Sequence, residues 1–421
     1  MTKITKVFEL IDFIDKARWG EENLPDEGLI NFYKDADSLS NDTKLLTHWI
    51  CYITDRQMPF QRIWDIGGFV FSEMIDAIKE NEDLDVLNPN LKKKSFFIKR
   101  EDYPIVNTFK EKDSEKHIFL SHTETNDNDR LIKRGFKKND FPYFIPRFYP
   151  SDYKSILSTF IILKDFEFNF TKYIIYILEK IEFNRDNFIS KLLFGLHLLT
   201  YYEIKRPKGE VIDDFINNKQ IAIDRKDKVM KILENNKNFE NKFEIFRKGI
   251  IYKQKRAWCS LRDFIKDLKF KKYFINSLVE NNFINVQIFN EEETLKQLEL
   301  PGDVWNTKPV FINCVLEDTK YNIKEIKKDF PKKLKEDIFK NENIKIGYPE
   351  QFDITFDFVP RMCENTNCSI CPFGLLNNKA NDFDKICIND KSKYCPILLI
   401  SCNYKMCCVG KNNCPFYKLY K

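Results

Sequence analysis

The sequence predicts a mainly α-helical protein that ends in a cysteine-rich, metal-binding module. Apolar residues recur at intervals of three and four over much of the chain, which is the period of amphipathic helices. Nine of the twelve cysteines lie in the last 59 residues of a 421-residue chain. A chain of this length can form a large core and more than one domain.

Four segments follow from the pattern of residues along the chain. Residues 1–90 are predicted to be helical, as in "TKVFELIDFIDKA" and "RIWDIGGFVFSEMIDAIKE". Residues 91–150 are polar without a long apolar stripe, so we expect an insertion of loops with possible short strands. Three prolines in nine residues of "FPYFIPRFYPSD" then indicate a linker. Residues 151–360 return to the helical period, and residues 361–421 form the cysteine-rich module.

The segment "KQKRAWCSLRDF" combines an aromatic residue with several charges. We expect Trp258, Leu261, Phe264 and Ile265 to lie in the core, with the charged side chains outside. The alternative is that this mixture of Lys, Arg and Trp faces nucleic acid.

The overall composition suggests a cytoplasmic protein that does not enter a membrane. No charged and apolar leader opens the chain, and apolar stretches such as "FISKLLFGLHLLTYY" are too short to span a bilayer. Residues 361–421 contain nine Lys or Arg and four Asp or Glu, so they carry 9 − 4 = +5 of formal charge, equal to the net charge of the chain. A basic tail is suited to a polyanion such as DNA, although a solvated surface can have the same bias.

The terminal cysteines are predicted to bind metal. They lie among Asn, Lys, Pro and Asp rather than on an apolar stripe, and a reducing compartment disfavours disulfides. Four thiolates around zinc usually come from two Cys-x2-Cys pairs, but here Cys368 and Cys371 have that spacing and Cys363 lies five residues upstream. A [4Fe–4S] cluster is often held by three close cysteines and a more distant fourth. We therefore expect such a cluster, with zinc as the alternative.

The stretch "YPEQFDITFDFVPRMCENTNCSICPFG" resembles the C-terminal end of the endonuclease III and adenine glycosylase family. In this helix–hairpin–helix superfamily, a Cys-x6-Cys-x2-Cys-x5-Cys loop carries a [4Fe–4S] cluster. Cys363, Cys368 and Cys371 match the first three ligands, with x4 in place of x6. No cysteine has the spacing of the fourth ligand, for which Cys387 is the nearest candidate and Cys395 or a later cysteine is an alternative. The surplus cysteines, Cys395 to Cys414, could form a second site.

Two other stretches resemble the same family. "LLTHWICYITDRQMPFQRIW" is similar to its early helix, and Gln57 matches a Gln that wedges into the DNA base stack; a solvent-facing helix cap before Pro59 is the alternative. "LELPGDV" matches the beginning of the family's Leu-Pro-Gly-Val-Gly hairpin, which would lie near residues 300–304. Gly302 would present a backbone N–H to a DNA phosphate, but Val304 replaces the second Gly of the motif.

The resemblance implies a DNA glycosylase or AP lyase that recognises damaged or modified bases in double-stranded DNA. Lys308 lies one residue beyond the position of the family's nucleophilic Lys, and "LEDTK" nominates Asp318 as the carboxylate that stabilises a cationic sugar. Asp329 has a separation from Lys308 closer to that of the family, and each of these residues could instead be a solvated charge. Basic residues such as Arg361 would contact phosphates. The alternatives are a non-catalytic nucleic-acid-binding protein with iron–sulfur or zinc, and an electron-transfer protein.

Overall fold

The computed structural model describes residues 38–54, 68–89, 91, 95–99, 118–120, 150–180, 188–200, 227, 231 and 251–283. These residues are mainly helical, which confirms the predicted class for this part of the chain. The α-helices are α3 (Asn41–Thr54), α5 (Gly68–Asn81), α7 (Pro150–Leu163), α8 (Phe170–Lys180), α9 (Phe188–Leu199), α12 (Ile251–Lys266) and α13 (Leu268–Glu280). Two short 3-10 turns, η3 (Asp85–Leu87) and η8 (Lys164–Phe166), and two strands, β1 (Phe97–Lys99) and β2 (Ile118–Leu120), accompany them.

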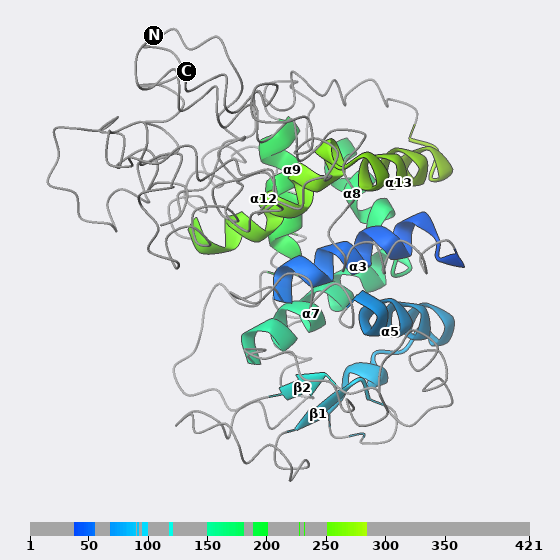
Figure 1. Ribbon diagram of the computed structural model, residues 1–421, viewed down its shortest axis with the longest axis vertical. Helices are drawn as coiled ribbons and strands as arrows, with labels where there is room; N and C mark the ends of the chain where they lie inside the picture. Colours follow the sequence, from blue (N-terminus) through cyan, green and yellow to red (C-terminus); the bar gives the residue numbers. More distant parts are fainter. Residues whose placement is uncertain are drawn as a thin grey trace, which may run out of the picture.

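Helix α3 lies at the centre of the described helices and contacts α5, α7, α8, α12 and α13 (Figure 1). The helix is capped by Ser40, whose Oγ accepts a hydrogen bond from the backbone N–H of Thr43 at 3.1 Å. Every residue from Asp42 to Thr54 is buried. A helix that is buried on all sides must pair its polar side chains inside the protein, because water cannot reach them.

Helices α8 and α9 pack closely because α9 has a glycine at their contact. A Cβ atom built on Gly195 would lie 3.0 Å from Cγ2 and 3.1 Å from Cγ1 of Ile177 on α8. The phenolic O–H of Tyr173, also on α8, donates a hydrogen bond to the Gly195 carbonyl at 2.7 Å. A side chain at position 195 would therefore require the Ile177 side chain, or the helix that carries it, to shift.

Helices α12 and α13 follow each other along the chain, and both contact α3 (Figure 1). Asp267 separates them and caps α13, since its carboxylate accepts hydrogen bonds from the backbone N–H groups of Lys269 and Phe270 at 3.0 and 2.9 Å. Asn282, just beyond the end of α13, has a φ of 63°. This left-handed conformation is common after a helix, and Asn tolerates it better than most residues.

The two strands lie in the segment where loops and possible short strands were expected, and they pair antiparallel below the helices (Figure 1). The backbone around them is anchored to α7 through Tyr153. Its O–H donates a hydrogen bond to the carbonyl of Leu87 at 2.9 Å, and its ring meets the ring of Phe97 edge-on with 5.1 Å between centroids. The paired residues are Phe97 with Leu120, Ile98 with Phe119, and Lys99 with Ile118.

Several predictions concern segments outside the described residues. These include the hairpin near residues 300–304, the module formed by residues 361–421, and the domain boundaries, all of which stay predictions. Among the helices that are described, none combines the length and the apolar character needed to cross a lipid bilayer.

Candidate functional site

The residues nominated from the sequence for DNA binding, catalysis and metal ligation lie outside the described ranges. The structure therefore neither brings them together nor separates them. They are Gln57, Gly302, Lys308, Asp318, Arg361, Cys363, Cys368, Cys371 and Cys387.

Two cysteines do fall within the described helices, and both belong to the core. Cys51 on α3 and Cys259 on α12 are buried, and neither forms a disulfide. Within the described ranges, no group of three or more His, Cys, Asp or Glu side chains is arranged to hold a metal ion.

A buried polar cluster joins α3 to α12, and it is the main concentration of ionisable side chains that the described helices bring together. We call it the α3–α12 cluster; its members are His48, Tyr52, Ser260, Arg262 and Asp263. The residues of α3 contribute the imidazole and the phenol, and those of α12 contribute the hydroxyl, the guanidinium and the carboxylate. All five residues are buried.

Asp263 is the centre of the α3–α12 cluster. Its Oδ2 accepts hydrogen bonds from Nε2 of His48 at 3.0 Å and from the O–H of Tyr52 at 2.5 Å. Its Oδ1 accepts from Nε and Nη2 of Arg262 at 2.8 and 2.6 Å. A carboxylate offers about four acceptor positions, so Asp263 is fully satisfied. The Arg262 charge compensates it, as a buried carboxylate requires.

The environment fixes the protonation states in the cluster. Burial raises the pKa of Asp263, but the guanidinium of Arg262 and the hydrogen bonds from His48 and Tyr52 outweigh burial and hold it well below its usual range. Burial lowers the pKa of His48, even though Asp263 opposes this effect. Burial, reinforced by the Asp263 charge, raises the pKa of Tyr52 well above its usual range. At neutral pH the cluster thus contains one anion, one cation and a neutral imidazole.

Ser260, His48 and Asp263 lie in the order of a hydrolytic triad. The Oγ atom of Ser260 is 3.4 Å from Nδ1 of His48, and the opposite ring nitrogen contacts Asp263. A triad serine needs access to its substrate, whereas Ser260 and His48 have no solvent-exposed area. The rings of Phe264 and Phe270 also cover the imidazole, with centroids 4.9 and 4.1 Å away. The arrangement therefore connects two helices and does not present a nucleophile.

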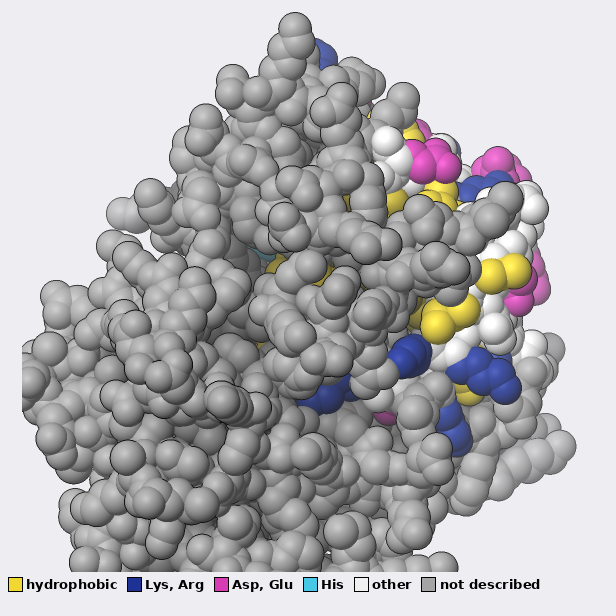
Figure 2. All heavy atoms as spheres, turned by 90° about the horizontal axis from the view of Figure 1, so that it is seen from above, with side chains coloured by type: hydrophobic (Ala, Val, Ile, Leu, Met, Phe, Trp, Pro, Cys, Tyr) yellow, Lys and Arg dark blue, Asp and Glu magenta, His cyan; other side chains and the backbone are white. Residues whose placement is uncertain are grey.

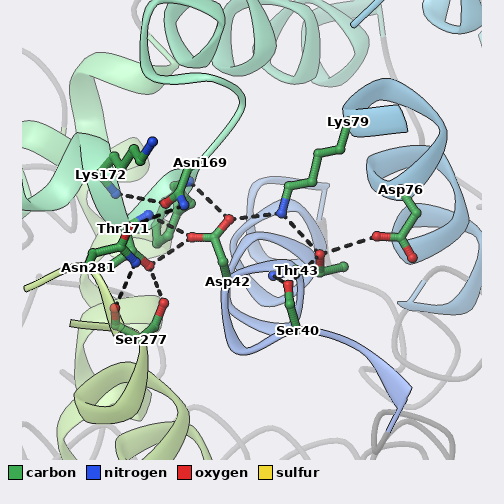
Figure 3. A network of polar contacts seen from close by, with 11 residues as sticks. Ser40, Asp42, Thr43, Asp76, Lys79, Asn169, Thr171, Lys172, Ser277 and Asn281 are labelled. Carbon is green, nitrogen blue, oxygen red and sulfur yellow. Dashed lines mark hydrogen bonds and ion pairs between the residues drawn. The ribbon is translucent and has the colours of Figure 1, made fainter. Parts of the chain in front are cut away.

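A second polar network connects the beginning of α3 to three other helices (Figure 3). The carboxylate of Asp42 accepts hydrogen bonds from the backbone N–H groups of Phe170 and Thr171 at 3.2 and 2.7 Å, and so caps α8 from another helix. It also accepts from Oγ1 of Thr171 at 2.8 Å and from Nζ of Lys79 on α5 at 2.9 Å. The Thr171 hydroxyl lies 2.7 Å from that of Ser277 on α13. Asp42 thereby links α3, α5, α8 and α13.

The structure corrects one prediction about α12. Trp258, Leu261, Phe264 and Ile265 are buried as expected, with at most 3% of their surface exposed. The charged side chains were expected to lie outside, but Arg262, Asp263 and Lys266 are buried as well. Arg262 and Asp263 lie inside because they pair with each other and with the polar face of α3. The alternative, in which the described part of this segment faces nucleic acid, is also wrong for these buried residues.

Sequence patterns contain a partial signal for the α3–α12 cluster. His48 and Tyr52 are four residues apart, and Ser260 and Asp263 are three apart, so each pair shares one face of its helix. Both faces also carry apolar residues, and a polar pair on an otherwise apolar face suggests a buried partner. The identity of that partner could not be deduced, because the two pairs are about 210 residues apart in the chain.

In the view of Figure 2, the Lys and Arg side chains of the described surface lie mostly in its lower part and the Asp and Glu side chains mostly in its upper part, with apolar side chains between them. Both signs of charge are therefore present on the described part of this face.

Comparisons with known proteins identify no relative. No protein-family model, curated protein or solved structure matches the chain. Its function must be inferred from its own residues.

Proposed function

We propose that this protein is a DNA-binding iron–sulfur protein of the endonuclease III type, which recognises damaged or modified bases in double-stranded DNA and cleaves their N-glycosidic bonds. The observation that carries the proposal is the accumulation of nine cysteines in the last 59 residues, beginning with Cys363, Cys368 and Cys371. The mainly helical character of the described residues is compatible with this class of protein.

The cysteine-rich tail has the donor set that an iron–sulfur cluster needs. Cluster irons are ligated by thiolates, and Cys363, Cys368 and Cys371 with Cys387 would supply one for each iron of a [4Fe–4S] cluster. The buried thiols of Cys51 and Cys259 belong to the helical core and are not needed for this set. The bound cluster would supply a covalent crosslink that folds the tail.

A folded tail would present cations to the DNA backbone. Residues 361–421 carry nine Lys or Arg against four Asp or Glu. Among the basic residues, Arg361, Lys379, Lys385 and Lys393 would contact phosphates, which contribute most of the salt-dependent affinity for DNA. Gln57 and the backbone N–H of Gly302 would add contacts to the base stack and to one phosphate.

Base removal would use Lys308 and Asp318. The neutral amine of Lys308 would form a bond to C1′ of the deoxyribose while the bond from C1′ to the base nitrogen breaks, and the base would leave with a proton. The carboxylate of Asp318 would stabilise the positive charge that develops on the sugar. Lys308 must be partly desolvated for its amine to be neutral near pH 7.

DNA binding can be tested by fluorescence anisotropy with the full chain and a labelled duplex at several salt concentrations. Replacing Lys379, Lys385 and Lys393 by Gln should reduce the slope of log affinity against log salt by about 2.7, at roughly 0.9 per phosphate contact. Replacing both Cys368 and Cys371 by Ser should abolish specific binding, while the matched core variant Cys51→Ser should bind normally. Unchanged binding in the double cysteine variant would contradict the proposed role of the cluster.

Catalysis requires a separate assay, in which release of oxidised, deaminated and alkylated bases from duplex DNA is measured. The variants Lys308→Met and Asp318→Asn should each lose base release while they still bind DNA. Glu317→Gln is the matched control, because it removes the carboxylate next to Asp318 and should leave the rate unchanged; Asp329→Asn tests the alternative carboxylate. Base release that survives replacement of both Lys308 and Asp318 would refute the assignment of these residues. DNA binding without any base release would indicate a non-catalytic member of this class.

A further inference from the structure

We propose that His48 is an acid-sensitive latch, which holds α12 and α13 against α3 while its imidazole is neutral and releases them when the ring gains a proton. The inference rests on the described helices alone and does not depend on the proposed DNA-binding function. It is based on the hydrogen bonds of the ring, on the charges around it and on its burial.

The hydrogen bonds define one tautomer of the neutral ring. Asp263 is ionised and can only accept, so Nε2 of His48 carries the proton of their 3.0 Å hydrogen bond. In a neutral imidazole the other nitrogen, Nδ1, is an acceptor. The Ser260 hydroxyl, 3.4 Å away, is placed to donate to it. Both ring nitrogens therefore serve to join α3 to α12, and a proton on Nδ1 would eliminate the acceptor that Ser260 uses.

Among the residues that the structure describes, the carboxylate that faces the ring is already compensated by another cation. From α12, His48 faces the Asp263 carboxylate and the Arg262 guanidinium, which already compensate each other through two hydrogen bonds. From α3, it faces the phenol of Tyr52, which is neutral and donates to the same carboxylate. From α13, the ring of Phe270 contacts the imidazole. The ring of Tyr273, on the same helix, makes a cation–π contact with the ammonium of Lys44, which lies 4.4 Å from the ring centroid.

Protonation would thus place two cations beside one carboxylate in a buried site, on a ring that has no solvent-exposed area. An additional charge in such a site is strongly unfavourable unless water reaches it. Separation of α12 from α3 would admit that water. The protein can relieve the charge by opening at this contact, which is why we infer a local release of α12 and α13.

The direction of the pH dependence follows from the pKa of His48, which burial lowers in the closed state. In the open state the ring should titrate near its ordinary pKa of about 6.5. As pH falls below about 6.5, the open state binds a proton that the closed state does not. The equilibrium constant for closure therefore falls about tenfold per pH unit, until the pH reaches the pKa of His48 in the closed state. Asp263 acts in a different range, because its lowered pKa stabilises the closed state above about pH 4 and this contribution is lost only below that value.

Hydrogen exchange of the full chain, measured by mass spectrometry between pH 7.5 and 4.5 and corrected for intrinsic exchange rates, tests the latch. Peptides from α12 and α13 should lose protection by up to tenfold per pH unit below about 6.5. Peptides from α5 and α7 should lose less. In His48→Gln the amide can still donate to Asp263 but cannot gain a proton, so the pH dependence should disappear. The matched control is His197→Gln on α9, another buried histidine, and it should keep the wild-type profile.

Three results would overturn the proposal: a pH dependence that persists in His48→Gln, one that disappears in His197→Gln, or an equal loss of protection in α5 and α7. If His48→Gln does not fold, Ser260→Ala provides an independent test. It removes the hydrogen bond to Nδ1 that favours the neutral ring, so the pKa of His48 in the closed state should rise. The loss of protection should therefore level off at a higher pH than in the wild type. An identical profile in Ser260→Ala would also refute the latch.

Discussion

Asp42→Ala should be among the most destabilising substitutions in the described helices. Its carboxylate receives four hydrogen bonds from two other helices: two from backbone N–H groups and one from a hydroxyl at the beginning of α8, and one from the Lys79 ammonium on α5 (Figure 3). Alanine provides none of these acceptors. Because Asp42 is 6% exposed, water cannot readily take its place.

The expected loss in the free energy of unfolding is about 3 kcal/mol. Removal of a helix N-cap acceptor costs about 1 kcal/mol. Leaving a second buried donor, the backbone N–H of Phe170, without this acceptor adds on the order of 1–2 kcal/mol. The ion pair with Lys79, whose side chain is 24% exposed, contributes roughly 0.5 kcal/mol after allowance for solvent screening.

Urea titrations followed by circular dichroism will measure this loss at neutral pH. Lys79→Met removes the ion pair together with the hydrogen bond from Lys79 to the Thr43 hydroxyl, and should cost roughly 0.5–1 kcal/mol. Asn41→Ala, one residue away, removes an exposed hydrogen bond to Glu280 and should change stability by no more than about 0.5 kcal/mol. A cost for Asp42→Ala below about 1 kcal/mol, or one no larger than that of Lys79→Met, would refute the assignment of Asp42 as a link between helices.

Two further substitutions test the packing and the charge balance of the core. Arg262→Met should destabilise the fold by about 3–5 kcal/mol, because it leaves the Asp263 carboxylate buried without its cation. Urea titrations will measure this loss. A near-neutral effect would show that water or another group compensates Asp263. Gly195→Ala should cost about 1–3 kcal/mol, because the new Cβ would lie 3.0 Å from Ile177. Combining it with Ile177→Ala should cost less than the sum of the two single changes, and strict additivity would contradict a direct clash.

The helices could be predicted because their signal is local. In α12, the spacing of Trp258, Leu261, Phe264 and Ile265 places these residues on one buried side, and the structure confirms this. Periodicity identifies an apolar face from residues a few positions apart. It therefore predicted the class and the position of several helices without knowledge of their neighbours.

The buried polar contacts could not be predicted because their partners are distant in the chain. A charge such as Arg262 is normally placed at the surface, and its burial becomes favourable only once Asp263, His48 and Tyr52 are assembled around it. Asp42 likewise caps a helix that begins about 130 residues later. A single sequence without relatives contains no record of such pairings. The cysteine pattern supports a prediction for the opposite reason, since metal ligation uses short spacings, and that prediction concerns residues outside the described ranges.

Iron and acid-labile sulfide analysis of the anaerobically purified protein, with its visible absorption spectrum, decides whether the terminal cysteines hold an iron–sulfur cluster. We predict a brown protein with about four iron and four sulfide per chain. Both should be lost in Cys363→Ser, Cys368→Ser and Cys371→Ser, and retained in the core variants Cys51→Ser and Cys259→Ser. Colourless protein that contains zinc without sulfide, or terminal cysteines oxidised to disulfides, would contradict the proposed cluster.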